Sequence, residues 1–157
     1  MRLETVLSTH LMNVNMRKIK EINEIIVHCS DTKITQNFDI SDIRRWHTDP
    51  KPKGNGWSDV GYHYYIKLNG VIQKGRDLDV TGAHVRGRNK RTVGICFEGG
   101  KDQYGEMWSG PNPSQVLSFR TLKASIDLIV GKELPVAGHR KYDSRKSCPN
   151  FNVKTLL

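Results

Sequence analysis

An Asn-Gly pair at residues 69 and 70 lies between two apolar runs, in the stretch YHYYIKLNGVIQKGR that begins at Tyr62. Asn-Gly is the commonest sequence in two-residue hairpin loops, because both residues tolerate the positive φ angles that such a turn requires. We therefore predict two antiparallel strands around Asn69-Gly70. This pair constrains the fold, since a chain with an antiparallel hairpin cannot form an all-parallel sheet.

Three further apolar segments predict strands. EIIVHCS, which starts at Glu24, and TVGICFEGG, which starts at Thr92, are short and rich in β-branched residues. Such runs are typical of strands buried on both faces. LPVAGH, which ends at His139, predicts a last short strand. Cys96, inside the second run, is expected to be a small core side chain.

A short helix is predicted in DISDIRRWHTD. Asp39 and Ser41 are capping candidates, and Ile40 and Ile43 are followed by Trp46 or His47 at helical spacing. An apolar stripe at this spacing predicts that one face of the helix is buried.

The longest helix is predicted in NPSQVLSFRTLKASIDLIVGKE, where Asn112 can cap and Pro113 suits the first turn. Its expected buried stripe consists of Leu117, Leu122, Ile126 and Ile129 or Val130. Strands and helices alternate, but the hairpin interrupts any regular βαβ series. We therefore expect an α/β fold in a single domain, with a mixed central β-sheet flanked by α-helices.

The composition narrows the functional classes. The chain has 157 residues, which suits one domain, and no apolar run is long enough for a membrane span. Its 25 basic residues exceed its 16 acidic residues by nine. This charge favours an anionic partner such as nucleic acid, an acidic polymer or the cell envelope, although a solvated basic surface explains it equally well.

The cysteines and the N-terminal stretch indicate where the chain is made. Cys29, Cys96 and Cys148 are widely spaced and odd in number, which favours synthesis in a reducing compartment, the cytoplasm. The first residues lack the apolar core of a secretory signal peptide. Residues 1–20 are expected to be a disordered tail, and residues 21–157 to form the domain. The alternative is that translation starts at Met16, so that the residues before it do not belong to the native protein.

Two histidines and a cysteine can meet at one edge of the sheet. His28 ends the first apolar strand and His139 ends the last, so the two imidazoles come together if these strands are parallel neighbours. Cys148 follows nine residues later in a basic loop that favours its thiolate. Two histidines and a thiolate form a known catalytic zinc set. The alternative is that both histidines are hydrogen-bonded structural residues.

Five motifs in this order resemble the zinc-dependent N-acetylmuramoyl-L-alanine amidases. They are VHCSDTK, IRRWH, GWSDVGYHYYIKLNGVIQKGRD, GAHVRGRNKRTVGICFEGG and GHRKYDSRKSCPNFNVK, and they cover about residues 24–154. The resemblance is greatest to the short phage-lysozyme type, which is related to the peptidoglycan recognition proteins.

This resemblance implies specific residue roles. It places the ligands of one Zn²⁺ ion on His28, His139 and Cys148, the trio that strand order also suggests. It further implies a catalytic tyrosine at Tyr62, a catalytic lysine at Lys146, and substrate-groove residues at His84 and Asn89.

The implied function is hydrolysis of the amide bond between N-acetylmuramic acid and L-alanine in bacterial peptidoglycan by a phage or prophage endolysin. Such an enzyme is expected to be monomeric, to bind muropeptides rather than nucleic acid, and to reach the cell wall after release from the cytoplasm. Two alternatives remain from the same resemblance. One is a peptidoglycan-binding module with weak catalysis, and the other is a regulatory partner of a phage RNA polymerase.

Overall fold

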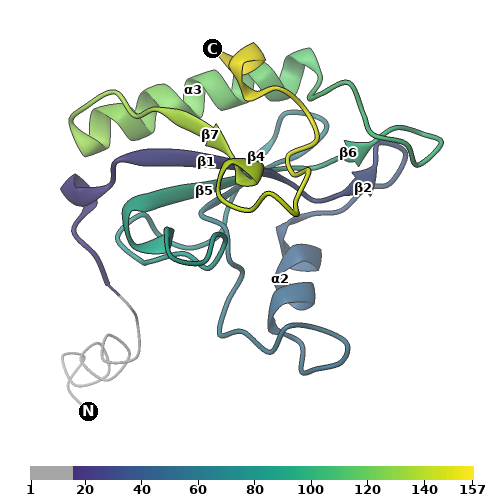
Figure 1. Cartoon of the computed structure of the whole chain (residues 1–157), viewed down its shortest axis with the longest axis horizontal. Coiled ribbons are helices and arrows are strands. Elements are labelled where there is room, and N and C mark those ends of the chain that lie inside the picture. Colours follow the sequence, from purple (N-terminus) through teal and green to yellow (C-terminus); the bar gives the residue numbers. More distant parts are fainter. Residues whose placement is uncertain (1–15) are drawn as a thin grey trace.

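The computed structural model describes residues 16–157, which form a central sheet with helices on both faces (Figure 1). The sheet has five strands in the order β4-β3-β5-β1-β7. These strands are β1 (Glu24–Cys29), β3 (Tyr64–Ile66), β4 (Ile72–Lys74), β5 (Thr92–Phe97) and β7 (Val136–Gly138). Strands β2 (Thr32–Lys33) and β6 (Gly100–Lys101) form a separate parallel pair.

The described residues also contain two α-helices and four short 3-10 helices. The α-helices are α2 (Ile40–Thr48) and α3 (Pro113–Val130). The 3-10 helices are η1 (Ile19–Glu21), η2 (Asn89–Arg91), η3 (His139–Lys141) and η4 (Val153–Leu156). None of the helices in residues 16–157 combines the length and the apolar character needed to cross a lipid bilayer.

The sheet is mixed, which confirms the predicted fold class. Strand β1 pairs in parallel with β5 on one side and with β7 on the other, and β3 is parallel to β5. Only the β3-β4 pair of this sheet is antiparallel. The carboxyl ends of β1 and β7 therefore lie side by side at one edge of the sheet.

The hairpin forms where the Asn-Gly pair predicts it, but its loop is longer than two residues. The N–H of Lys67 donates to the carbonyl of Val71, so Leu68, Asn69 and Gly70 form a three-residue connection. Gly70 has a φ of 85° and its N–H donates to the carbonyl of Lys67. A turn followed by a left-handed glycine is the usual form of a three-residue hairpin loop.

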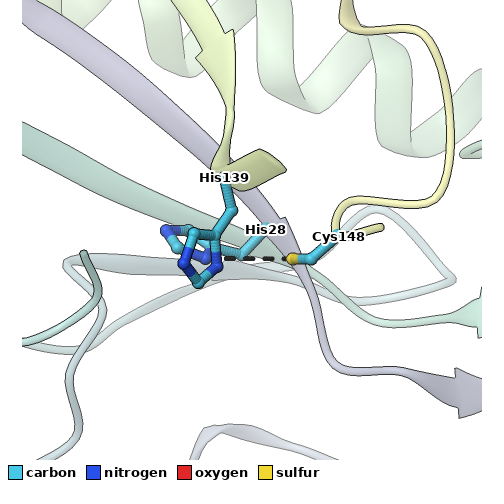
Figure 2. Close-up of side chains that lie close together, drawn as sticks. All are labelled: His28, His139 and Cys148. Carbon is cyan, nitrogen blue, oxygen red and sulfur yellow. Dashed lines mark hydrogen bonds between the residues drawn. The ribbon is translucent and has the colours of Figure 1, made fainter. Parts of the chain in front are cut away.

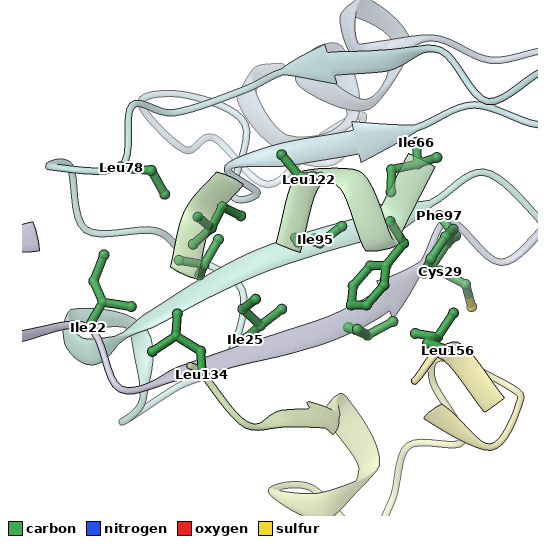
Figure 3. Packing of buried hydrophobic residues seen from close by; sticks show 14 of the residues in the cluster. Ile22, Ile25, Cys29, Ile66, Leu78, Ile95, Phe97, Leu122, Leu134 and Leu156 are labelled. Carbon is green, nitrogen blue, oxygen red and sulfur yellow. The ribbon is translucent and has the colours of Figure 1, made fainter. Parts of the chain in front are cut away.

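The two faces of the sheet are covered by different helices. Alternate residues of β1 and β5, such as Ile25 and Ile95, lie in the main core with Leu122 of α3 (Figure 3). Phe119 of α3 belongs to the same cluster. The intervening residue Cys96 packs with Ile43 of α2 on the opposite face. Because side chains alternate along a strand, His28 lies on the face of Cys96, away from α3.

Helix α3 begins as predicted but buries a different stripe. Asn112 caps it together with Gln115, and Pro113 occupies the first turn. The prediction that Leu117 is buried was wrong, since this side chain is 68% exposed. Its buried residues are Gln115, Phe119, Leu122, Lys123, Ile126 and Val130. The buried face is thus shifted around the helix axis, because Phe119 contributes the bulk that packs on the sheet.

The N-terminal prediction falls mainly outside the described residues, since residues 1–15 of the expected tail are not among them. Within the remainder, Arg17 is buried. Its Nε donates to the carbonyl of Leu78 over 2.8 Å, and its Nη1 donates to the carbonyl of Thr92. These bonds attach the segment before β1 to β5 and to the loop that precedes it.

Candidate metal centre

Three donor side chains meet at the edge where β1 and β7 end (Figure 2). His28 is the penultimate residue of β1, and His139 follows β7 directly as the first residue of η3. Cys148 approaches from the loop after η3. Because β1 and β7 are parallel neighbours, the two histidines lie next to each other at the same edge of the sheet.

The three donor groups are close enough to share one ion. One ligand atom from each of His28, His139 and Cys148 lies within 4.8 Å of the others. The two imidazole ring centroids are 4.8 Å apart, and Nδ1 of His28 is 3.9 Å from the sulfur of Cys148. This arrangement places a nitrogen of each histidine and one sulfur around a common point.

The sulfur of Cys148 lies in an environment that favours its thiolate. The backbone N–H of Cys29 donates to it over 3.4 Å. A hydrogen bond from the Cys29 thiol lowers the pKa of Cys148 most, and contacts with His139 and His28 add to this effect, while burial opposes it. The same pairing raises the pKa of Cys29, which remains the thiol. One thiolate and two imidazoles fit a divalent transition metal that keeps an open coordination position.

The donor groups lie in a pocket of about 370 Å³. The pocket is lined by His28, Cys29, Asp31, His47, Trp57, Tyr62, Ala83, His84, His139, Arg145, Lys146, Ser147, Cys148 and Asn150. Its walls therefore come from the strand ends, from α2 and the loop after it, from the loop before β5 and from the basic loop around residue 146.

Tyr62 and Lys146 both line this pocket. The ring centroid of Tyr62 is 5.0 Å from that of His28. Burial raises the pKa of the Tyr62 phenol well above its usual value, and the neighbouring cysteines add to the shift, so this hydroxyl is a hydrogen-bond donor at neutral pH. Lys146 is exposed, and its backbone N–H donates to the carbonyl of Asp143 within the basic loop.

His84 lines the pocket as a nearly buried side chain, whereas Asn89 is not among the lining residues. His84 is 9% exposed, and its Nδ1 is 2.9 Å from Nε2 of His28. Burial lowers the pKa of His84 well below its usual value, with a further contribution from His28. The side-chain oxygen of Asn89 accepts the backbone N–H groups of His84 and Val85 at 2.8 and 2.9 Å.

Several residues of the pocket were not expected from the sequence. Besides Cys29, they include His47, whose ring lies 5.3 Å from that of Tyr62 and 4.8 Å from that of Trp57. Burial lowers the pKa of His47 to about 4, and Arg76 and His28 contribute. The His47 Nδ1 accepts the N–H of Gly61 over 2.9 Å. The only sequence signal was the proximity of IRRWH to the glycine-rich loop that follows it.

The comparisons with known proteins agree with this geometry. Residues 18–151 match the N-acetylmuramoyl-L-alanine amidase family. The chain is 36% identical to the endolysin of Klebsiella phage KP32 over 144 residues, which are 92% of this chain and 91% of that protein. The amidase LysC from Clostridium intestinale superposes with a TM-score of 0.71 at 25% identity, over 88% of this chain and 85% of that one. A bumblebee peptidoglycan recognition protein gives a TM-score of 0.72 at 25% identity, over 87% of this chain and 80% of that one. The chain therefore belongs to the N-acetylmuramoyl-L-alanine amidase family and is an amidase of the phage endolysin type.

Proposed function

We propose that this amidase uses one Zn²⁺ ion, held by His28, His139 and Cys148, to cleave the bond between the lactyl group of N-acetylmuramic acid and L-alanine. The observation that supports this most directly is the convergence of three donor atoms within 4.8 Å at the wall of a pocket. The same pocket contains a protonated phenol and an ammonium group, which suit amide hydrolysis.

The donor set favours zinc over other divalent ions. Thiolate and imidazole are preferred ligands of Zn²⁺, whereas Mg²⁺ and Ca²⁺ prefer oxygen. When bound, Zn²⁺ supplies a Lewis acid that polarises a carbonyl and lowers the pKa of water to about 7. The role of Cys148 is to remain a thiolate, and its contacts with Cys29 favour that state.

Tyr62 is proposed to stabilise the negative charge that develops on the amide oxygen. Its ring lies against that of His28, so its position is fixed relative to the donor groups. A partly buried phenol that stays protonated can donate a hydrogen bond to this oxygen. Removal of one such donor typically lowers kcat about 10²- to 10³-fold.

Lys146 is proposed to neutralise charge at the mouth of the pocket. It is two residues before Cys148, so its backbone is held close to the donor groups while its side chain is free to approach a substrate. The departing amine must gain a proton, and Lys146 and Tyr62 are the proposed sources, since both line the pocket.

The proposal also covers the setting of the reaction. The substrate is a peptidoglycan muropeptide, and the enzyme acts as a monomer on the cell wall after its release from the cytoplasm. Sedimentation of the purified protein at micromolar concentration is expected to give the mass of a single chain.

The decisive experiment is a digestion of purified cell-wall sacculi by the zinc-loaded protein. We expect the sacculi to clear and new L-alanine amino termini to appear, without new reducing sugar ends. Protein stripped by a chelator is the matched control, and it should recover activity when zinc is restored.

Other outcomes of this digestion would contradict the proposal. Zinc-loaded protein that binds muropeptides without releasing amino termini would instead be a peptidoglycan-binding module. Full activity after the complete removal of metal would exclude the proposed role of zinc.

A further inference from the structure

The two ring nitrogens of His28 face different partners. Nδ1 is 3.9 Å from the sulfur of Cys148, whereas Nε2 is 2.9 Å from Nδ1 of His84. An ion shared with Cys148 is therefore within reach of Nδ1 only. Nε2 points away from the donor groups and into the protein.

We propose that His84 is a positioning residue, which fixes the tautomer and the ring orientation of His28 through a hydrogen-bonded chain that continues to Thr92. This inference rests on the proposed function, since it requires His28 to be a metal ligand. It assigns to His84 a role different from contact with substrate.

The positions of the protons along this chain can be assigned step by step, from His28 through His84 to Thr92. A neutral His28 that binds metal through Nδ1 has its proton on Nε2 and donates it to Nδ1 of His84. His84 must then have its own proton on Nε2, which is 3.2 Å from the hydroxyl oxygen of Thr92. The Thr92 hydroxyl in turn donates to the carbonyl of Arg88 over 3.0 Å. Every group in the chain is satisfied by this one arrangement.

The hydroxyl of Thr92 sets the direction of the chain. Its single proton is donated to the carbonyl of Arg88, so towards His84 the hydroxyl oxygen acts as an acceptor for the proton on Nε2. The Nδ1 of His84 is then an acceptor for Nε2–H of His28. The reversed chain would require Thr92 to donate to His84 and would remove its bond to the carbonyl of Arg88, so the chain favours the tautomer of His28 that leaves Nδ1 available.

The His84 ring has little room to turn. A Cβ atom at Gly94 would lie 2.7 Å from Cγ of His84, and one at Gly82 would lie 2.8 Å from its Cδ2. The backbone of His84 is held as well, because Asn89 accepts its N–H. Glycine within a strand marks a close approach of another group, and here that group is the imidazole.

Most side-chain polar atoms of His84 and Asn89 bond within the protein. Both nitrogens of His84 already have protein partners, His28 and Thr92. The oxygen of Asn89 accepts two backbone N–H groups. In the sequence motif GAHVRGRN, His84 and Asn89 thus form a connected support for His28.

The chemical identity of the residue that accepts the His28 proton affects the basicity of His28 as a metal ligand. A carboxylate hydrogen-bonded to a metal-binding histidine raises the basicity of that ligand. The neutral imidazole of His84 raises it less. A metal held by His28 would therefore be a stronger Lewis acid with His84 at this position than with an aspartate.

The first test compares the zinc affinity of three variants by competition with a chelator. Asparagine has its polar atoms at the δ position, where Nδ1 of histidine lies, whereas glutamine has them at the ε position. We expect His84→Gln and His84→Ala to weaken zinc binding about 10- to 100-fold. His84→Asn keeps an acceptor for His28 and should stay within about threefold of the parent.

His63→Gln is the matched control. His63 is a buried histidine close to His84, with a ring centroid separation of 6.0 Å, but its hydrogen bonds go to Arg17, Val80 and Gly94. It should lose stability without losing zinc affinity in the folded protein. Equal affinities for the parent, His84→Gln and His84→Ala would overturn the inference.

The second test needs no variant. In the nitrogen-15 NMR spectrum of the zinc-loaded parent, we expect His28 and His84 both to have their proton on Nε2. A proton on Nδ1 of His84 would overturn the inference even if every variant failed to fold. A parent that does not bind zinc at all would instead contradict the proposed function, so the two failures are distinguishable.

Discussion

The backbone N–H of Cys29 donates to the sulfur of Cys148 across 119 positions of sequence, over 3.4 Å. Strand β1 therefore contributes to the metal centre twice, with the His28 side chain and with the backbone of the next residue. Since the Cys29 side chain belongs to the core on the α3 face, the strand connects the thiolate to the main hydrophobic core.

Replacement of Cys148 by serine should abolish tight zinc binding. A serine hydroxyl does not ionise at neutral pH, so only two of the three donors remain. We expect the zinc content after desalting to fall from one ion per chain to near zero, together with the release of L-alanine amino termini. Cys96→Ala is the control, since Cys96 is a buried cysteine outside the donor set. Stoichiometric zinc in Cys148→Ser would contradict the assignment of this ligand.

Tyr62→Phe should separate metal binding from catalysis. The phenyl ring can still pack against His28, but the donor for the developing oxyanion is lost. We expect kcat to fall about 10²- to 10³-fold with an unchanged zinc content. Steady-state kinetics on a soluble muropeptide measures this directly. A variant with parental kcat would remove Tyr62 from the mechanism.

Lys146→Gln should lower the rate much more than the same change at the preceding residue. Arg145 also lines the pocket, but its guanidinium pairs with Asp143 at 2.9 Å. Both substitutions remove one positive charge from the same loop. We expect a loss of about 10- to 100-fold in kcat/KM for Lys146→Gln, in the range of a single general acid or charge-stabilising group. Arg145→Gln should stay within a few-fold of the parent, and equal losses would indicate only a general effect of charge.

The stability of the metal-free protein should decrease as the pH falls from 6.5 towards 3. Burial, followed by the charge of Arg17, lowers the pKa of His63 to about 3. Below pH 6.5 the unfolded chain binds a proton at this residue that the folded chain does not, so protonation favours unfolding. One such histidine contributes a slope of at most about 1.4 kcal/mol per pH unit. Urea unfolding at pH 7, 6, 5 and 4 should show a smaller slope for His63→Gln, and an identical slope would contradict the shift.

Gly94→Ala should weaken zinc binding although residue 94 is not a ligand. The added methyl group would lie 2.7 Å from Cγ of His84 and must displace the imidazole that supports His28. We expect lower stability and a zinc affinity reduced about tenfold or more. Ile95→Val is a suitable control, because Ile95 faces the α3 core and this change costs only about 0.5–1.5 kcal/mol. Parental zinc affinity in Gly94→Ala would show that the ring can move without consequence.

Much of the fold could be predicted because local signals and burial agree. The run from Glu24 to Cys29 is buried along its whole length, as its composition indicates. The caps at Asp39 and Asn112 form as predicted, since each side chain accepts a backbone N–H in the first turn of its helix. The parallel pairing of β1 with β7, on which the meeting of His28 and His139 depends, is also confirmed.

The remaining features depend on contacts between distant segments. The β2-β6 pair is only two residues long in each strand, so it has no periodic pattern to recognise. The exposure of Leu117 follows from which face of α3 meets the sheet, and an apolar residue gives no warning of exposure. The partnership of His28 with His84 joins residues 56 positions apart. In each case the deciding information is three-dimensional packing rather than local propensity.

His28 and Cys148 are 120 positions apart, so an ion held by both is a crosslink between the first strand of the sheet and the last loop of the chain. Closing a loop of that length reduces the entropy of the unfolded chain by an amount worth about 4 to 5 kcal/mol in simple polymer theory. Loading with metal should therefore protect the C-terminal segment from proteases. Stripped protein is expected to be cut first in that segment, before the rest of the sheet is attacked.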